Sequence, residues 1–237
     1  MKKITTYFGM TLLCAVANGA TLAGGWDSSL DLGLTMTQGN SETTLLTTNL
    51  NLSKSEANDE YLAGLGYTFG EDSGNVSADE LTGFFSWNRL VSETQYAGFR
   101  LEGRRDDIAK VDYRIQATAL YGIYLIKNDT TTFSIEGGPG YTTQSLDSVD
   151  SDSAHFYVGQ KASHQLTENT HLTQSIAAYA QLEDFDNHNI NFSFGIETRM
   201  SEAMSLKILV ENKYESEPAA GAENNDLKLV SGISYKF

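Results

Sequence analysis

The chain alternates between apolar and polar residues over most of its length from Trp26 onward. The last eleven residues show this clearly, because Leu227, Leu229, Ile233 and Phe237 share one face while Lys and small residues dominate the other. A period of two indicates a β-strand, since successive side chains point to opposite faces of a sheet. About ten residues is also the length that a tilted strand needs to cross a bilayer.

The same pattern predicts twelve strands, and ten or fourteen are the alternative counts. One segment departs from strict alternation, because Tyr96 is out of phase with Ala97 and Phe99, and a β-bulge there is one explanation. The predicted segments are residues 26–37, 43–53, 60–70, 79–88, 95–105, 112–125, 131–143, 154–166, 171–182, 190–200, 204–214 and 227–237.

Alternation alone fits a soluble barrel or sandwich as well as a membrane barrel, so other features must separate these architectures. The predicted connections alternate between short and long, as periplasmic turns and outer loops do. Aromatic residues lie near both ends of the apolar faces, as in interfacial belts. The longer connections are expected at 71–78, 144–153, 183–189 and 215–226. The sequence therefore predicts a transmembrane antiparallel β-barrel of the bacterial outer-membrane type over residues 26–237.

The first twenty residues have the pattern of a secretory signal peptide, with Lys2 and Lys3 before a short apolar stretch and a small-residue cleavage site near 17–20. The only cysteine, Cys14, lies in this segment, so the mature chain would have neither disulfides nor thiolate metal sites. Removal of the two lysines takes the formal net charge from −15 to −17. A chain this acidic is not expected to bind nucleic acid, whose phosphates need Lys and Arg.

Charged residues on the predicted inward faces are nine basic and nine acidic, so the interior is expected to be nearly neutral. One interpretation is an interior closed by salt bridges, because buried charges normally pair. The other is a narrow, wet pore with little charge preference. The residues predicted to line the lumen are Arg100, Glu102, Arg104, Arg114, Glu136, Lys161, Glu197, Arg199, Lys207 and Glu211, and the full inward set adds Asp27, Asp31, Glu60, Glu80, Asp112, Lys213, Lys228 and Lys236.

The predicted outer loops hold sixteen acidic residues against Lys110 and Arg105, so the rim carries most of the negative charge and is a candidate surface for cations. The acidic residues are Glu42, Glu71, Asp72, Asp79, Asp106, Asp107, Asp147, Asp150, Asp152, Glu183, Asp184, Asp186, Glu215, Glu217, Glu223 and Asp226. The run 147–153 lacks the glycine and terminal glutamate of a helix–loop–helix calcium site, so no metal site is predicted there.

No catalytic or cofactor-binding residue is predicted. The four histidines, His155, His164, His171 and His188, do not have metal-ligand spacing, and a Gly-x-Ser-x-Gly motif is absent. The pattern also places no Ser, His and acid at one level of the wall. A lipid-acting enzyme and a soluble secreted binding barrel remain as alternative functions.

Two motifs resemble a known family. The opening Trp26-x-x-x-Leu30-x-Leu32-Gly33, followed by residues 37–42 (TQGNSE), is similar to the start of the YdiY-like family, and residues 133–141 (FSIEGGPGY) are similar to its central block. Its members are often described as salt-induced outer-membrane proteins, and their function is unknown. The resemblance implies a barrel in the bacterial outer membrane and carries over no catalytic residue.

The final strand looks like the C-terminal signal of outer-membrane barrels, with Tyr235 and Phe237 as the recognised residues. The expected partners are therefore outer-membrane lipid and lipopolysaccharide, the barrel-assembly machinery and, at the outer loops, cations. The expected function is a non-enzymatic outer-membrane barrel of the salt-induced type, either a narrow small-solute or ion channel or a structural envelope protein.

Overall fold

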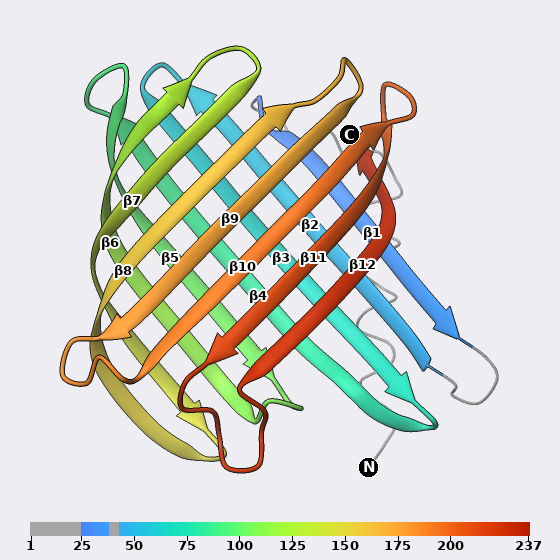
Figure 1. Ribbon diagram of the computed structural model, residues 1–237, viewed down its shortest axis with the longest axis vertical. Helices are drawn as coiled ribbons and strands as arrows, with labels where there is room; N and C mark the ends of the chain where they lie inside the picture. Colours follow the sequence, from blue (N-terminus) through green and yellow to red (C-terminus); the bar gives the residue numbers. More distant parts are fainter. Residues whose placement is uncertain (1–24, 38–42) are drawn as a thin grey trace.

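Twelve antiparallel strands form one closed barrel in the computed structural model, which describes residues 25–37 and 43–237 (Figure 1). The predicted architecture and strand count are confirmed. The proposed signal peptide and Cys14 lie outside the described residues. The strands are β1 Asp27–Thr37, β2 Thr43–Glu56, β3 Asp59–Asp72, β4 Asn75–Leu90, β5 Gln95–Asp106, β6 Val111–Lys127, β7 Thr131–Leu146, β8 Val149–Gln165, β9 Thr170–Gln181, β10 His188–Arg199, β11 Met204–Glu215 and β12 Asn225–Lys236.

In the described part of the chain, no helix is both long enough and apolar enough to cross a membrane.

Each strand pairs with its neighbours in the chain, and β12 closes the ring against β1, as the sequence predicts. This closing seam joins Ser29–Gly33 to Gly232–Lys236 through five register pairs, whereas β1 and β2 share eleven. Phe237 extends the seam, since its amide donates to the Ser28 carbonyl at 3.2 Å and its carbonyl accepts from Ser28 Oγ at 2.6 Å. The seam is therefore short, and its backbone contacts gather at the end of the barrel that holds Phe237.

Two hairpins are longer than the sequence predicts. β3 and β4 are joined by Ser73 and Gly74 alone, and β7 and β8 by Asp147 and Ser148. All four turn residues have positive φ, between 49° and 79°, which suits two-residue hairpin turns whose twist matches the flanking strands. The prediction of long connections at 71–78 and 144–153 is therefore wrong, because most of these polar residues continue the strand pairing instead of forming loops.

Large apolar side chains cover the outside of the barrel while polar side chains are buried within it. Leu229, Leu125 and Tyr141 are more than half exposed, whereas Glu80, Glu136 and His155 are almost fully buried. This distribution is the reverse of that in a soluble domain and is expected of a barrel with lipid outside and polar groups inside.

Aromatic rings gather at the end of the barrel where β1 begins. The Trp26 and Tyr61 ring centroids are 6.3 Å apart, and Tyr61 lies opposite Trp87 in the β3–β4 register. Lys54 lies over the Trp26 ring at 5.9 Å. Such mixed aromatic and cationic clusters suit an interface between hydrocarbon and water.

Tyr96 shows why β5 departs from simple alternation. Its side chain is 2% exposed and donates a hydrogen bond to Glu136, so this aromatic residue faces the interior with Arg100 and not the outer surface. The β4–β5 register runs through Tyr96 without a shift, and the β5–β6 irregularity lies between Arg104 and Asp106. A β-bulge therefore does not explain the position of Tyr96, although the predicted segment does contain a register irregularity near its end.

Candidate functional site

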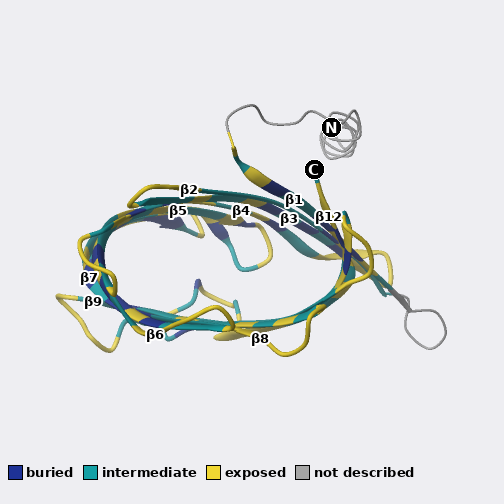
Figure 2. Ribbon diagram, turned by 90° about the horizontal axis from the view of Figure 1, so that it is seen from above, coloured by how far each residue is buried: buried dark blue, intermediate teal, exposed yellow. Residues whose placement is uncertain are grey.

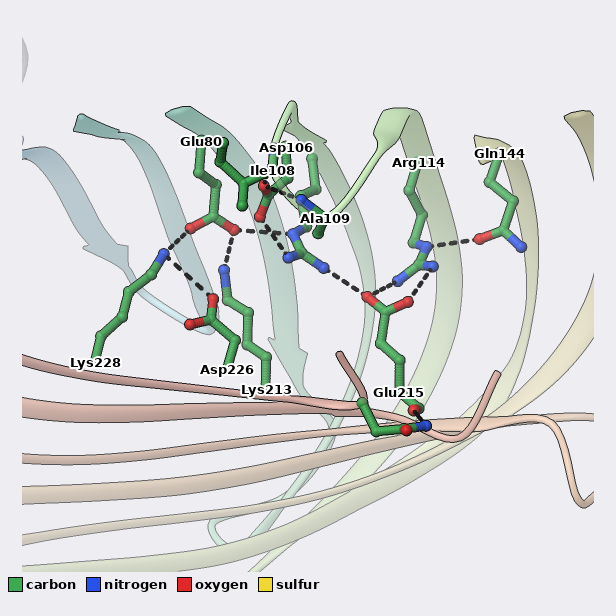
Figure 3. Close-up of polar contacts among 12 residues, drawn as sticks. Glu80, Asp106, Ile108, Ala109, Arg114, Gln144, Lys213, Glu215, Asp226 and Lys228 are labelled. Atoms are coloured by element: carbon green, nitrogen blue, oxygen red, sulfur yellow. Dashed lines mark hydrogen bonds and ion pairs between the residues drawn. The ribbon is translucent and has the colours of Figure 1, made fainter. Parts of the chain in front are cut away.

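Eight charged residues meet inside the barrel near the end where β11 ends and β12 begins, which we call the mouth. Together they form the mouth cluster, which contains four cations and four anions (Figure 3). Its members are Glu80, Arg104, Asp106, Arg114, Lys213, Glu215, Asp226 and Lys228. Because the two signs balance, the cluster satisfies the requirement that buried charges be paired.

Glu80 on β4 holds one half of the mouth cluster together. Its carboxylate forms ion pairs with Lys213 on β11 and Lys228 on β12, and it accepts a hydrogen bond from Arg104 Nε at 2.9 Å. The Glu80 side chain is only 5% exposed. A buried carboxylate is stable in this position because three cations replace the water that it loses.

Arg104 and Glu215 form a bar across the interior. Arg104 Nη1 lies 2.6 Å from Glu215 Oε1, although their strands, β5 and β11, are separated by five strands on either side of the closed ring. Arg114 on β6 reinforces the bar, because its Nη1 and Nη2 each donate to Glu215 at 2.9 Å. Two side chains can bridge opposite walls only where the barrel is narrow, and the barrel is indeed flattened in cross-section (Figure 2).

Asp106 couples the mouth cluster to the β5–β6 turn. One carboxylate oxygen accepts from Arg104 Nη2 at 2.7 Å, and the other accepts from the amides of Ile108 and Ala109 at 3.1 and 2.9 Å. The β5–β6 turn also contacts the β11–β12 loop, since Lys110 Nζ donates to the Ala220 carbonyl at 2.6 Å. Two connections from opposite walls therefore meet at the mouth.

The sequence predictions for four acidic residues near the mouth are wrong. Asp106, Glu215 and Asp226 are not outer-loop residues, because each lies in a strand and belongs to the mouth cluster, where Asp106 and Glu215 are buried. Asp112 does not point inward but is exposed beside the β7–β8 turn, where it accepts from the Ser148 amide at 2.8 Å. A register irregularity between Val111 and Tyr113 displaces Asp112, and alternation cannot reveal such a shift.

A second group, the mid-barrel cluster, consists of Tyr96, Arg100, Glu102, Glu136, Tyr157, Lys161 and Tyr179. Glu136 accepts from the hydroxyls of Tyr96 and Tyr157 at 2.6 and 2.7 Å and pairs with Lys161 at 2.8 Å and Arg100 at 3.2 Å. Tyr179 donates to Glu102. Two cations again balance two anions. The three tyrosines pack with Leu120 as an apolar cluster inside the barrel, so the β5–β9 side of the interior is filled.

The other predicted lumen residues lie outside these two clusters. Lys207 pairs with Asp31 at 2.6 Å. Glu197 lies opposite Lys207 in the register, and Glu211 lies opposite Lys228, yet neither acid has a cation within ion-pair distance among residues 25–37 and 43–237. Arg199 is exposed at the far end, where it donates to the Glu168 carbonyl and Asn169 Oδ1 at 3.0 and 2.9 Å.

Behind the mouth cluster, the interior is accessible to solvent. Phe84 lies directly opposite Gly64 and Glu102 in the register, so it shares their inward face, yet its side chain is 41% exposed. Leu62, two residues along from Gly64 on the same face, is 37% exposed. Apolar groups inside a barrel reach such exposure only where side chains do not fill the interior.

One Ser–His pair corrects the prediction that no such residues align. Ser163 Oγ and His171 Nε2 are 2.5 Å apart, and Glu197 lies opposite His171 in the β9–β10 register. However, no hydrogen bond joins Glu197 to His171 in the described structure. A catalytic triad needs an acid on the second imidazole nitrogen, so this pair lacks the orientation that activates a serine.

Each of the remaining histidines makes one or two polar contacts. His155 lies between Thr118 and Thr142 at 3.0 and 2.8 Å, His164 contacts Thr131 Oγ1 at 2.9 Å, and His188 contacts the Phe185 carbonyl at 3.3 Å. The described residues contain no group of three or more His, Cys, Asp or Glu side chains arranged to hold a metal ion.

Comparison with solved structures shows the fold. The chain is similar to the NanC porin (10% identity, TM-score 0.56, covering 89% of this chain and 100% of the porin). It is also similar to the COG4313 outer membrane channel from Pseudomonas putida F1 (11% identity, TM-score 0.54, covering 90% and 96%). A third similar structure is a KdgM porin in complex with disordered oligogalacturonate (6% identity, TM-score 0.50, covering 90% and 99%).

In sequence comparison, no curated protein matches the chain. A family model does match, over residues 30–237, which include the whole barrel except the first residues of β1. The match covers far more than half of the chain and agrees with the YdiY-like resemblance of its motifs. The chain belongs to the family described as "Protein of unknown function, DUF481".

Proposed function

We propose that this protein is a non-enzymatic outer-membrane channel that conducts small polar solutes through a narrow passage crossed at the mouth by the Arg104–Glu215 bar. The observation that carries the proposal is the solvent exposure of the inward-facing Phe84 behind the mouth cluster. A barrel filled by side chains would have no room for water there. The likeness in fold to a porin and an outer membrane channel supports the same function.

In this proposal, lipid and lipopolysaccharide surround the apolar outer surface. The start of β1 and the end of β12, which form the seam, face the periplasm. The assembly machinery would recognise the strand that carries Tyr235 and Phe237, whose rings stack at 6.4 Å. The salt-induced type inferred from the family resemblance fits an acidic rim, because salt screens charge at that surface. Expression measured against external salt tests this part.

Single-channel recording of the purified barrel in a planar bilayer tests conduction. The wild type is expected to give small, discrete conductance steps. Glu215→Gln removes the charge that joins both arginines to the opposite wall, so we expect a conductance increase of about twofold or more as the bar is released. Glu223→Gln, which changes an exposed loop residue in the same way, is the control and should leave the conductance unchanged.

A structural envelope barrel is the competing function, and the extent of the salt bridges favours it. If correctly folded wild type and Glu215→Gln both fail to conduct, the channel proposal is wrong and the structural function stands. Enzyme activity is tested separately with a phospholipid hydrolysis assay. We expect no turnover in the wild type and no difference for His171→Ala, whereas activity abolished by that substitution would establish a hydrolase.

A further inference from the structure

A polar recess lies on the inner wall beside the mouth cluster, where β6, β7, β8, β9 and the start of β10 each contribute inward-facing side chains. Register pairs place these residues in adjacent rows, with Gln116 opposite Thr142, Thr142 opposite Ser153, and Gln181 opposite His155. The uncharged residues that line the recess include Gln116, Thr142, Ser153, Gln181, Asn187 and Asn189. Such a concentration of amides and hydroxyls contrasts with the charged clusters elsewhere inside the barrel.

The two charged residues at the edge of the recess are already occupied. Arg114 directs Nη1 and Nη2 to Glu215 and Nε to Gln144 Oε1 at 2.6 Å, so its charge is already paired within the protein. Glu217 accepts from Asn187 Nδ2 at 2.8 Å. The recess therefore offers an anionic ligand no unpaired cation, and its one acid, Glu217, forms no ion pair among the described residues.

Several uncharged groups in the recess have hydrogen-bonding capacity to spare. Gln116 uses only Nε2, in a 3.3 Å bond to Thr142, so its carbonyl oxygen has no hydrogen-bond donor among residues 25–37 and 43–237. Within the described structure, the side-chain amide of Gln181 makes no hydrogen bond, although it faces the interior beside His155. Amides present donors and acceptors side by side, which matches ligands that carry adjacent hydroxyl groups.

We propose that this recess binds neutral polyhydroxylated solutes, such as small sugars and polyols, as they pass the mouth. A sugar hydroxyl both donates and accepts, so it can satisfy a free amide N–H and a free carbonyl together, whereas a simple inorganic ion can satisfy only one of them. An acidic sugar would need an unpaired Arg or Lys for tight recognition, and Arg114 is already paired. The proposal rests on the channel function only for passage, because binding in the recess needs no open pore.

The test compares binding and permeation in the folded barrel. Saturation-transfer NMR on detergent-solubilised protein, with sorbitol and glucose as probes and gluconate as the acidic counterpart, measures weak binding directly. Liposome swelling with the same three solutes measures passage. The variant is the double substitution Gln116→Met with Gln181→Met, which keeps the side-chain length and removes the amides. Gln165→Met is the matched control, because Gln165 ends β8 at the other end of the barrel.

We expect sorbitol and glucose to bind to the wild type and to Gln165→Met, and to bind about tenfold more weakly to the double variant, as the loss of two or more neutral hydrogen bonds predicts. Gluconate should bind more weakly than sorbitol to the wild type. Equal sorbitol binding in the double variant, or stronger binding of gluconate, overturns the recess proposal even if liposomes swell. Sorbitol binding without swelling supports the recess and counts against the channel.

Discussion

At the scale of single residues, Glu80 is the member of the mouth cluster on which most others depend. Its carboxylate faces Arg104, Lys213 and Lys228, and without it the three cations would lie close together with too little negative charge. Removing one partner of a buried ion pair is strongly destabilising, because the other charge stays buried. The mouth cluster is thus a stabilising feature only while its charges balance.

Glu80→Gln is therefore expected to lower the free energy of unfolding by about 3 kcal/mol. Urea titration of the barrel in lipid vesicles, followed by intrinsic fluorescence, measures the change. Adding Lys213→Met to Glu80→Gln should restore part of the loss, because one excess cation is removed. Glu223→Gln is the control. A Glu80→Gln variant as stable as the wild type would show that solvent, and not the carboxylate, neutralises the three cations.

Alternation identifies which side chains face inward, and this works well where a strand is regular. It correctly places Arg100, Arg104 and Glu136 on the inner face. In the structure, Glu136 also accepts hydrogen bonds from Tyr96 and Tyr157. It cannot show that Tyr96 belongs to that group, because an aromatic ring normally indicates the lipid side. Nor can it show which of several inward acids a cation chooses, since that depends on contacts across the barrel.

At the scale of elements, the seam between β1 and β12 depends on close backbone approach. A Cβ added at Gly232 would lie 2.0 Å from the Leu32 carbonyl oxygen, a contact that requires the two strands to separate. Gly103 on β5 is the matching case, because nothing lies within 4 Å of a Cβ added there. Alanine substitutions at these two glycines therefore distinguish the general effect of a methyl group in a strand from its specific effect on the seam.

Gly232→Ala is expected to weaken closure of the barrel, whereas Gly103→Ala leaves it unchanged. The gel shift between heated and unheated samples measures the closed fraction. We expect the compact, unheated band of Gly232→Ala to be lost at a lower temperature than that of Gly103→Ala. Equal behaviour of the two variants would mean that the seam accommodates the methyl group by a backbone shift.

Deletion of Phe237 removes the two hydrogen bonds that its backbone forms with Ser28 and the ring that stacks on Tyr235. We expect less folded protein in the outer membrane and a weaker heat-modifiable band. Phe237→Tyr keeps the backbone bonds and an aromatic ring, so it is the control and should assemble normally. Unchanged assembly after the deletion would remove Phe237 from the proposed recognition signal.

Strand number and pairing order follow from the sequence because period-two patterning extends through all but one of the wall segments. The ends of the hairpins do not follow from the sequence, because polar residues such as Asn75 and Ser151 suit loops as well as they suit strands that extend into water. What decides is the turn, where Ser73 and Asp147 adopt positive φ. Non-glycine residues adopt it seldom, so composition alone gives little warning of so tight a turn.

At the scale of the whole molecule, the two interior clusters are balanced in charge, whereas the rim is acidic. The mouth and mid-barrel clusters each contain equal numbers of cations and anions, whereas exposed acids such as Glu71, Asp72 and Asp152 surround the mouth. A ring of negative charge raises the local concentration of cations, and salt screens this field over about 10 Å at 0.1 M. The rim, and not the lumen, should therefore set ion preference.

If the barrel conducts, reversal potentials across a salt gradient should show cation preference at low salt that fades as salt rises. Changing Glu71, Asp72, Asp79, Asp147, Asp150 and Asp152 to their amides should weaken the preference without unfolding the wall. The control is the same measurement on Glu197→Gln, which alters an inward acid far from the rim. Anion preference, or cation preference that ignores ionic strength, would place selectivity in the lumen.

The closing seam also bears on how the barrel forms. Every other strand pair joins neighbours in the chain, whereas the bond between Ser28 and Phe237 joins residues 209 positions apart. The entropy lost on closing a loop grows with its length, so this pairing carries the largest entropic penalty and has only five register pairs to offset it. The wall should therefore assemble as a curved ribbon of hairpins first, with ring closure as the last and slowest step, and the ring should reopen at the place where it closed.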